Sequence, residues 1–202
     1  YGTTSREMSW IYSTYKTLSN SNIDSAASVT SKNIAQGGVS GRKEATGRGV
    51  FIGLRELLED KEEMAKINLK TGIKDKKVII QGFGNVGFHT AYFLEAAGAK
   101  IIGICEYNGS IYNSDGLSPD SVKSWLKDGK NLSEYENCKF YDDPYHVFYE
   151  ECDILVPAAL EEVINEANMY KIKAKIIAEG ANGPVTYEAD KYLAKNNTII
   201  LP

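Results

Sequence analysis

The sequence has few of the residues that build metal sites and hydrolytic triads. Its 202 residues include three cysteines and two histidines. Cys105, Cys138 and Cys152 are odd in number and fit no metal-ligand spacing. Cys105 and Cys152 lie in apolar, strand-like contexts and are expected to be buried, reduced thiols of an intracellular protein. His89 and His146 are expected in packing or at the surface, so we predict neither a metal site nor hydrolase chemistry.

Long apolar runs and basic stripes are also missing. No apolar run approaches the ~20 residues that a helix needs to cross a bilayer. The net charge is −4, and Lys and Arg residues alternate with acids. We therefore expect no membrane and no nucleic-acid partner. The chain starts at Tyr1 and stops at Pro202 directly after an apolar segment, so we expect that both ends are cut and that no targeting segment is readable.

One strongly patterned segment is present. An apolar run at 78–80 leads into glycines spaced G-x-G-x-x-G, Gly82, Gly84 and Gly87, and a helix is expected over 86–97. The first glycine permits a tight turn, the second lets a pyrophosphate approach the backbone, and the third lets the helix pack closely on the strand. Backbone N–H groups and the helix dipole then favour a diphosphate.

An acidic residue follows at the appropriate distance. The next expected strand, 100–105, ends at Glu106, about 20 residues after the glycines, where a carboxylate accepts hydrogen bonds from the adenosine ribose. Strand, glycines, helix, strand and acid together predict dinucleotide binding. The alternative is a glycine turn in some other α/β protein.

The rest of the second half alternates between strand and helix patterns. This alternation predicts a Rossmann-type α/β fold, a doubly wound, mostly parallel sheet with helices on both faces. A turn is expected at 108–110. The expected strands are 77–81, 100–105, 152–156, 174–178 and 198–201, and the expected helices are 86–97, 119–126, 161–169 and 188–195.

The first part of the chain is organised differently. Apolar residues at helical spacing predict a helix over 5–18, with Ser5 near its N-cap. Residues 19–41 are polar and aperiodic and are expected to form a long loop. A further helix is expected over 44–67, with Leu54 and Leu58 on its buried side.

Small and polar residues follow the expected strands at the edge where such sheets bind ligands. They include Ala158 and the segment 179–184, whose Gly-Ala-Asn-Gly run around Asn182 offers backbone groups and one amide without bulk. This composition favours contact with a flat nicotinamide ring. A plain loop is the alternative for this segment alone.

Four segments stand in the order and spacing of glutamate dehydrogenases: 6–10, 41–49, 81–87 and 178–184. Over nearly its whole length the chain resembles the C-terminal NAD-binding domain of the hexameric, animal-type members of the Glu/Leu/Phe/Val dehydrogenase family. The resemblance implies that residues 1–42 are a helix and long loop leading from a missing substrate domain. Residues 43–202 would be the dinucleotide-binding domain, truncated at its C-terminal end.

The resemblance also implies roles for individual residues. Thr46 and Asn85 would bond the nicotinamide carboxamide, the 84–86 amides would face the pyrophosphate, and Glu106 would bind the adenosine ribose. Ala158 and Asn182 would line the nicotinamide ribose pocket. The full expected cofactor site is Thr46, Gly82, Gly84, Asn85, Val86, Gly87, Glu106, Ala158 and Asn182.

The implied activity is the reversible oxidative deamination of L-glutamate to 2-oxoglutarate and ammonia, with NAD as cofactor and NADP as the alternative. By resemblance the catalytic lysine and aspartate precede Tyr1, so this chain holds no catalytic residue and is expected to bind nucleotide without chemistry. A homohexamer is implied for the full-length enzyme and a monomer for this chain, in the mitochondrial matrix or else the cytoplasm. Leucine, valine or phenylalanine dehydrogenases, and a nucleotide-sensing domain without catalysis, remain open alternatives.

Overall fold

The computed structural model describes residues 3–19 and 22–202. The chain forms two compact units, Tyr1–Ala45 and Thr46–Pro202. Helix α3 (Arg42–Glu59) contains this boundary, and the sequence-based boundary at residue 42 lies at the start of the same helix. The second unit contains the sheet and the candidate site.

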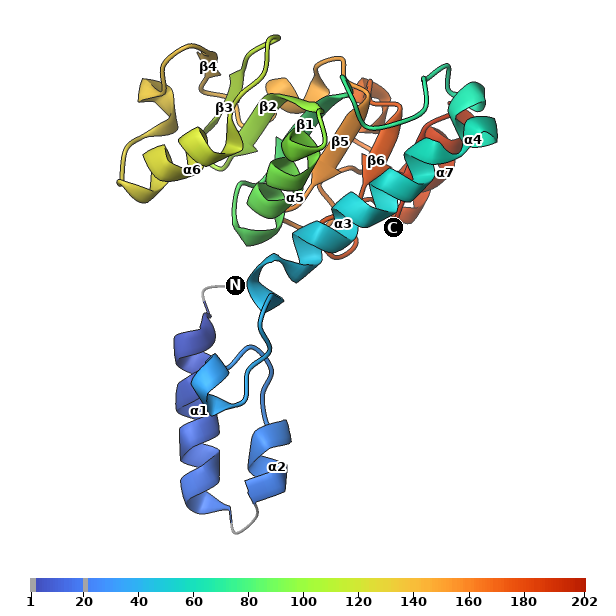
Figure 1. Cartoon of the computed structure of the whole chain (residues 1–202). Coiled ribbons are helices and arrows are strands. Elements are labelled where there is room, and N and C mark those ends of the chain that lie inside the picture. Colours follow the sequence, from blue (N-terminus) through green and yellow to red (C-terminus); the bar gives the residue numbers. More distant parts are fainter. Residues whose placement is uncertain (1–2, 20–21) are drawn as a thin grey trace. The chain divides into compact units, whose positions relative to one another are not determined.

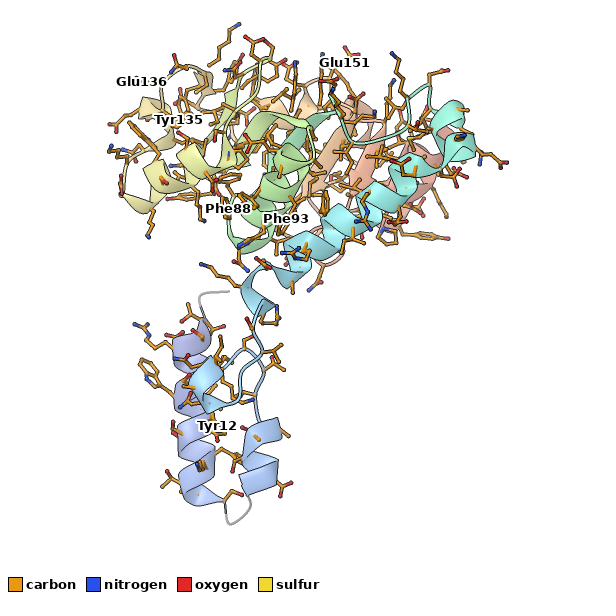
Figure 2. The ribbon with its side chains drawn as sticks, viewed as in Figure 1. Tyr12, Phe88, Phe93, Tyr135, Glu136 and Glu151 are labelled. Carbon is orange, nitrogen blue, oxygen red and sulfur yellow. The ribbon has the colours of Figure 1, made fainter. Side chains whose placement is uncertain are left out.

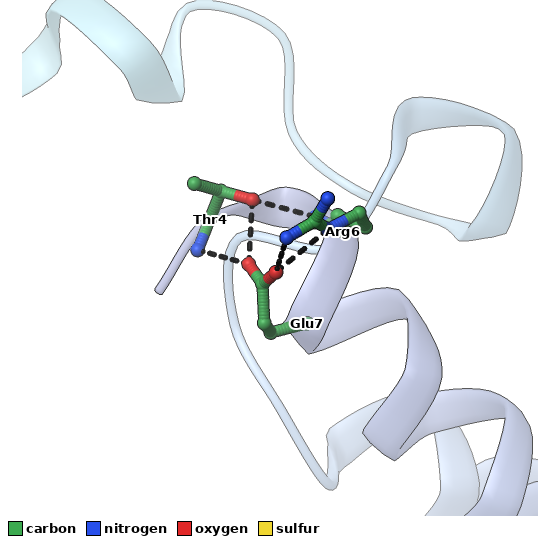
Figure 3. Close-up of polar contacts among 3 residues, drawn as sticks. All are labelled: Thr4, Arg6 and Glu7. Carbon is green, nitrogen blue, oxygen red and sulfur yellow. Dashed lines mark hydrogen bonds and ion pairs between the residues drawn. The ribbon is translucent and has the colours of Figure 1, made fainter. Parts of the chain in front are cut away.

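In the first unit, α1 spans Ser5–Leu18 as predicted, but its N-cap is Thr4 rather than Ser5. The Glu7 carboxylate accepts hydrogen bonds from the Thr4 backbone N–H and hydroxyl, each at 2.6 Å. The Thr4 hydroxyl in turn accepts from the Arg6 N–H at 3.2 Å (Figure 3). These bonds form a capping box, for which Thr-x-x-Glu is the sequence pattern.

The predicted loop at 19–41 is partly helical, so that prediction is wrong in part; residues 20–21 lie outside the described residues. Helix α2 spans Asn22–Ala27, and the 3-10 helix η1 spans Ile34–Gln36. Hydrogen bonds from the Asn33 N–H to Ser9 Oγ and from Gln36 Nε2 to Ser13 Oγ, both 3.3 Å, tie this region to α1. Short helices held by such distant contacts leave no clear periodicity in the sequence.

The single helix predicted over 44–67 is two helices, α3 and α4 (Lys61–Lys66). Asp60 separates them, since its Oδ1 accepts hydrogen bonds from the N–H groups of Glu62 (2.9 Å) and Glu63 (3.1 Å) and so starts α4. The apolar face of α3 is buried as predicted, with Leu54 and Leu58 inaccessible to solvent.

The second unit is built on a seven-stranded sheet in the order β4-β3-β2-β1-β5-β6-β7 (Figure 1). The five strands from β2 to β7 in this order are parallel, whereas β3 and β4 are antiparallel. The predicted mostly parallel α/β fold is confirmed. The strands are β1 Lys77–Gln81, β2 Lys100–Glu106, β3 Gly109–Tyr112, β4 Lys139–Tyr141, β5 Ile154–Pro157, β6 Ile176–Ala178 and β7 Ile199–Leu201.

Helices cover both faces of this sheet, because alternate residues of each strand point to opposite sides. On one face, α3, α5 (Asn85–Ala96) and α6 (Pro119–Lys127) pack with Val78 and Ile80. On the other, α7 (Tyr187–Lys195) and the 3-10 helix η3 (Val147–Tyr149) pack with Ile79. Two further 3-10 helices are η2 (Leu132–Glu134) and η4 (Met169–Lys171).

Two sequence-based predictions fail in this unit. Gly109 and Ser110, expected in a turn, begin β3, so the antiparallel edge was missed. The helix expected over 161–169 is absent from the described structure. Here Asn168 Oδ1 accepts from the Asn165 N–H (2.8 Å), and Glu162 has φ +52°. Asparagine side chains that bond nearby backbone groups offer an alternative to the helix.

The cysteines behave as expected. All three are free thiols, with Cys105 and Cys152 buried. Burial raises the pKa of both buried thiols far above the ordinary value. No helix among the described residues is long and apolar enough to cross a membrane.

Candidate functional site

The candidate site lies where the order of the strands reverses. Strand β1 pairs with β2 on one side and with β5 on the other. Backbone bonds join the start of each following loop to the end of the neighbouring strand: Gly82 N–H to Cys105 O (2.7 Å), Ala158 N–H to Gln81 O (2.7 Å) and Gly180 N–H to Pro157 O (2.9 Å). The loops after four parallel strands therefore meet at a topological switch point, the usual ligand position in open α/β sheets.

The three glycines of the turn are there for different physical reasons. Gly82 has φ +83°, and a Cβ there would lie 2.6 Å from Ala159 Cβ. A Cβ on Gly87 would lie 1.9 Å from the Gly82 carbonyl oxygen, so any side chain would push α5 off β1. A Cβ on Gly84 would meet nothing within 4 Å. Packing explains the first and third glycines, whereas the space beside Gly84 is open to a ligand.

Helix α5 begins at this open position. Gly84 is its N-cap, and no side chain of the described residues makes the capping hydrogen bond there. The backbone N–H groups of the first turn and the positive end of a 12-residue helix therefore point toward the space beside Gly84. Such an end binds phosphate or another anion.

Glu106 is tied to the glycine turn. Its Oε1 accepts a hydrogen bond of 2.5 Å from the Phe83 N–H. The residue ends β2 and is half-buried. One carboxylate oxygen thus positions the Glu106 side chain. The second oxygen can accept a hydrogen bond from a ligand hydroxyl.

The crossing of α3 and α5 positions Thr46. The next residue, Gly47, is buried, and a Cβ on it would lie 2.8 Å from Val86 O, Thr90 N and His89 Cβ. This close approach holds Thr46 beside the first turns of α5, which starts at Asn85. The two residues expected to share one ligand group therefore lie at one crossing. Sequence reasoning missed Gly47, whose position in a helix gives no local signal of a tight contact.

The loops after β5 and β6 form the remaining side of the site. Both the Gly180 and Ala181 N–H groups donate to Pro157 O at 2.9 Å, and a Cβ on Gly180 would lie 2.9 Å from Ala158 Cβ. Asn182 is exposed and precedes Gly183, which has φ +55°. Ala158 and Asn182 thus belong to two loops that are bonded together.

Glu179 starts the second of these loops; it lies in the predicted 179–184 segment but was not among the predicted cofactor-site residues. Its carboxylate is bonded by the Val185 backbone, and partial burial raises its pKa above the ordinary value. This contact links the two ends of the 180–184 loop. The sequence offers only the acid before Gly-Ala-Asn-Gly as a signal.

Two other residues of the site were missed. Lys123, from α6, donates from Nζ to Phe83 O at 3.2 Å and so brings a positive charge to the glycine turn. Gln81 is 7% exposed, and its buried Oε1 has no hydrogen-bond partner among the described residues. A buried acceptor of this kind needs a donor, such as ordered water or a ligand hydroxyl.

Three further polar side chains, those of Arg48, His89 and His146, have structural explanations. The Arg48 guanidinium lies 4.3 Å from the centre of the Phe93 ring, and Phe93 extends from α5 as Phe88 does (Figure 2). His89 Nδ1 bonds Asn85 O at 2.7 Å, and His146 stacks on Tyr141 with ring centres 3.8 Å apart. In the described part of the chain, no group of His, Cys, Asp and Glu could hold a metal ion.

The sheet order, the glycine turn at the switch point and the acid after β2 define a Rossmann-like dinucleotide-binding domain. The model of the Glutamate/Leucine/Phenylalanine/Valine dehydrogenase family matches residues 37–202. The chain belongs to this family, which confirms the resemblance read from the four sequence segments.

Individual relatives agree with this assignment. The chain is 44% identical over 201 residues to a protein named mitochondrial glutamate dehydrogenase from Dictyostelium discoideum, covering 100% of this chain and 40% of that one. Hetero-hexameric glutamate dehydrogenase from Thermus thermophilus matches with a TM-score of 0.84 at 26% identity, covering 100% and 45% of the two chains.

Glutamate dehydrogenase from Peptoniphilus asaccharolyticus matches with a TM-score of 0.72 at 32% identity, covering 100% and 44% of the chains. The chain thus spans less than half the length of these relatives.

Proposed function

We propose that this chain is the cofactor-binding part of a glutamate dehydrogenase, which converts L-glutamate reversibly to 2-oxoglutarate and ammonia. The observation that carries the proposal is the open space beside Gly84, at an uncapped helix start and next to an acid bonded to the same turn. Family membership and the names of the relatives supply the reaction. Residues 43–202 are the cofactor domain in this proposal.

Different residues of the site bind different parts of the cofactor. The Gly84–Val86 amides hold the pyrophosphate at the start of α5, and the free oxygen of Glu106 binds the adenosine ribose. Ala158 and Asn182 line the nicotinamide ribose pocket. Gly82 and Gly87 keep the turn and helix in the required geometry.

Thr46 and Asn85 orient the nicotinamide ring. A hydroxyl and an amide, held at one helix crossing, both donate to and accept from the carboxamide and so determine which ring face meets the substrate. The bound nicotinamide supplies hydride chemistry. The residues of this chain bind and orient it, and catalytic acid–base groups come from the remainder of the full-length protein.

The family description includes four amino-acid substrates, so a leucine, valine or phenylalanine dehydrogenase is the second candidate. The substrate pocket outside this chain decides between them, since a lysine placed for the γ-carboxylate favours glutamate. A nucleotide-sensing domain is the alternative if the full-length protein lacks the catalytic lysine and aspartate.

NAD is the proposed cofactor, since the Glu106 carboxylate repels a 2′-phosphate. Lys123, whose Nζ donates to the carbonyl of the same residue, Phe83, supplies an opposing positive charge, so that NADP can still bind, although more weakly than NAD. We propose a homohexamer in the mitochondrial matrix for the full-length enzyme, following the relatives named mitochondrial and hetero-hexameric. The isolated chain is proposed to be a monomer.

The test is a fluorescence titration of the 202-residue chain with NADH. Gly84→Val fills the open space and should raise the Kd at least about tenfold, equivalent to about 1.4 kcal/mol. Gly49→Val is the matched control, because a Cβ on Gly49 also meets nothing within 4 Å but lies on α3. Equal affinities for both variants, with unchanged thermal unfolding, would reject this site.

A further inference from the structure

A second hollow lies at the other end of the sheet. It is a cavity of about 380 Å³ whose wall includes Lys175 and Thr198, the residues directly before β6 and β7. The candidate cofactor site lies at the carboxyl ends of the strands, whereas this cavity lies at their amino ends. Nothing in the proposed function uses it.

The cavity combines an apolar wall with aromatic rings. Ile67, Ala174 and Leu193 contribute buried apolar side chains, with exposed fractions of 6%, 5% and 1%. Tyr170 and Tyr192 also line it and are solvent-exposed. A flat apolar group fits such a lining, since small-molecule sites pair apolar and aromatic surfaces with a few polar groups.

The charge of the lining is positive. Lys66, Lys173 and Lys175 line the cavity, and no acidic side chain is among the described residues that do. Lys66 is paired with Glu63 at 2.6 Å, outside the lining, and Lys175 Nζ donates to Asn68 O at 3.3 Å. Within residues 3–19 and 22–202, Lys173 has neither a hydrogen bond nor an ion pair.

Two asparagines add neutral donors. Asn68 follows the end of α4 and Asn197 follows the end of α7, with φ values of +52° and +59°. Asparagine tolerates this left-handed conformation after a helix, which explains why asparagine occupies both positions. Their side-chain amides make no hydrogen bond within the described structure, and both residues line the cavity. The bond from Lys175 Nζ to the Asn68 carbonyl is an ordinary contact at the end of a helix. Helix capping does not explain why three lysines line the same cavity.

We propose that this cavity binds a phosphorylated small molecule that carries a flat apolar group. The lysines would act as point charges on the phosphate, and the asparagine amides would donate to its oxygens. The apolar group would lie against Ile67 and Leu193 beside the tyrosine rings. The site is independent of the cofactor site and stands whether or not the proposed dehydrogenase function is correct.

The experiment is an NMR titration of the 15N-labelled 202-residue chain with phenyl phosphate at low ionic strength. Saturable shifts are expected at the amides of Lys173, Asn196 and Thr198. Inorganic phosphate should bind more weakly because it lacks the ring, and neutral benzyl alcohol should leave the lysine region unshifted. The Gly84 and Val86 amides report any binding at the glycine turn separately.

Matched variants decide the role of charge. Lys173→Gln should weaken phenyl phosphate binding by about fivefold, the upper range for one exposed charge pair. Lys127→Gln removes an exposed lysine in the last turn of α6, outside the cavity, and should leave the affinity unchanged. The proposal is overturned if the cavity amides show no saturable shift, if only Gly84 and Val86 shift, or if both variants lose affinity equally.

Discussion

At the scale of single residues, the backbone of Phe83 is held between two opposite charges. Its N–H donates to Glu106 Oε1 at 2.5 Å, and its carbonyl accepts from Lys123 Nζ at 3.2 Å. Glu106 follows a strand and Lys123 lies in a helix, so both elements tighten the same turn. A carboxylate and an ammonium therefore stand at the glycine turn, beside the position proposed for the adenosine ribose.

These charges should have opposite effects on cofactor choice. Glu106→Ala should narrow the preference for NADH over NADPH, because a repelling charge is removed, and Lys123→Gln should widen it. Each change is expected to be about fivefold, or about 1 kcal/mol. Titration of each variant with both reduced cofactors measures the ratio, with Lys127→Gln as the control. If Glu106→Ala weakened the binding of NADH and NADPH equally, this acid would not discriminate between the 2′-hydroxyl and the 2′-phosphate.

At the scale of elements, helix α1 owes its start to the Thr4–Glu7 capping box (Figure 3). Hydrogen bonds from the Thr4 hydroxyl and then the Thr4 backbone lower the pKa of Glu7 from 4.5 to about 2. The folded state thus favours the carboxylate. The stabilisation is fully present above pH 4.5 and is lost as the pH falls from 4.5 toward 2.

An acid titration followed by NMR should show this. The Thr4 amide, bonded to Glu7 Oε2, should shift with an inflection near pH 2, and α1 should lose helicity over the same range. Glu7→Gln keeps an acceptor but has no titrating carboxyl, so its Thr4 amide should show no such step. An inflection near 4.5 in the parent protein would mean that the capping box does not persist in solution.

The α3–α5 crossing is another element-scale feature, and it depends on Gly47. A Cβ there would lie 2.8 Å from the Val86 carbonyl oxygen and from Thr90 N, so two backbones would have to separate. Gly47→Ala should destabilise the protein by ~1–3 kcal/mol, the usual cost of overpacking. Gly49→Ala, on the same helix but in open space, should stabilise it by ~0.5–1 kcal/mol through helix propensity.

Urea unfolding of the two alanine variants gives the comparison. The midpoints should move in opposite directions relative to the parent. A gain in stability for Gly47→Ala would show that the crossing is looser in solution than its geometry requires.

At the scale of the whole molecule, sheet topology brings distant segments to one place. The proposed site draws Thr46 from α3, Asn85 from α5 and Asn182 from the loop after β6. The order β2-β1-β5-β6 places the ends of these strands side by side, so loops far apart in sequence meet.

If Thr46 and Asn85 orient the nicotinamide ring, their loss should affect turnover more than binding. In the full-length enzyme, Thr46→Val and Asn85→Ala should each lower kcat by about tenfold or more, since a lost buried hydrogen bond costs ~1–3 kcal/mol. The Kd for NADH should change less. Steady-state kinetics and cofactor titration on the same preparations measure both. Unchanged kcat in both variants would remove these residues from the site.

Much of the fold and the proposed site was predictable because the signals are local. The bounds of α1 and β1 match the expected ones, because apolar periodicity and a short apolar run act within one element. The glycine turn was also readable, since Gly82 needs a left-handed backbone and Gly87 a close contact with its own strand. The acid at 106 follows from the spacing of one strand–helix–strand unit.

The wrong predictions concern features that the local apolar pattern does not decide. The break at Asp60 and the lost helix at 161–169 depend on side chains that bond the backbone, which compete with a periodic pattern. Strands β3 and β4 are short, and their pairing is decided by a sheet edge rather than by their own residues.

The sequence by itself determined the class of fold, the dinucleotide turn and the family, because these depend on residue types at fixed spacing. Only the tertiary structure decided that Gly47 is a packing contact, that Lys123 binds the glycine turn and that lysines of two distant segments line one cavity. The physical reason is that such contacts join residues far apart in the chain. Their approach is set by the packing of whole elements, and no local pattern records it.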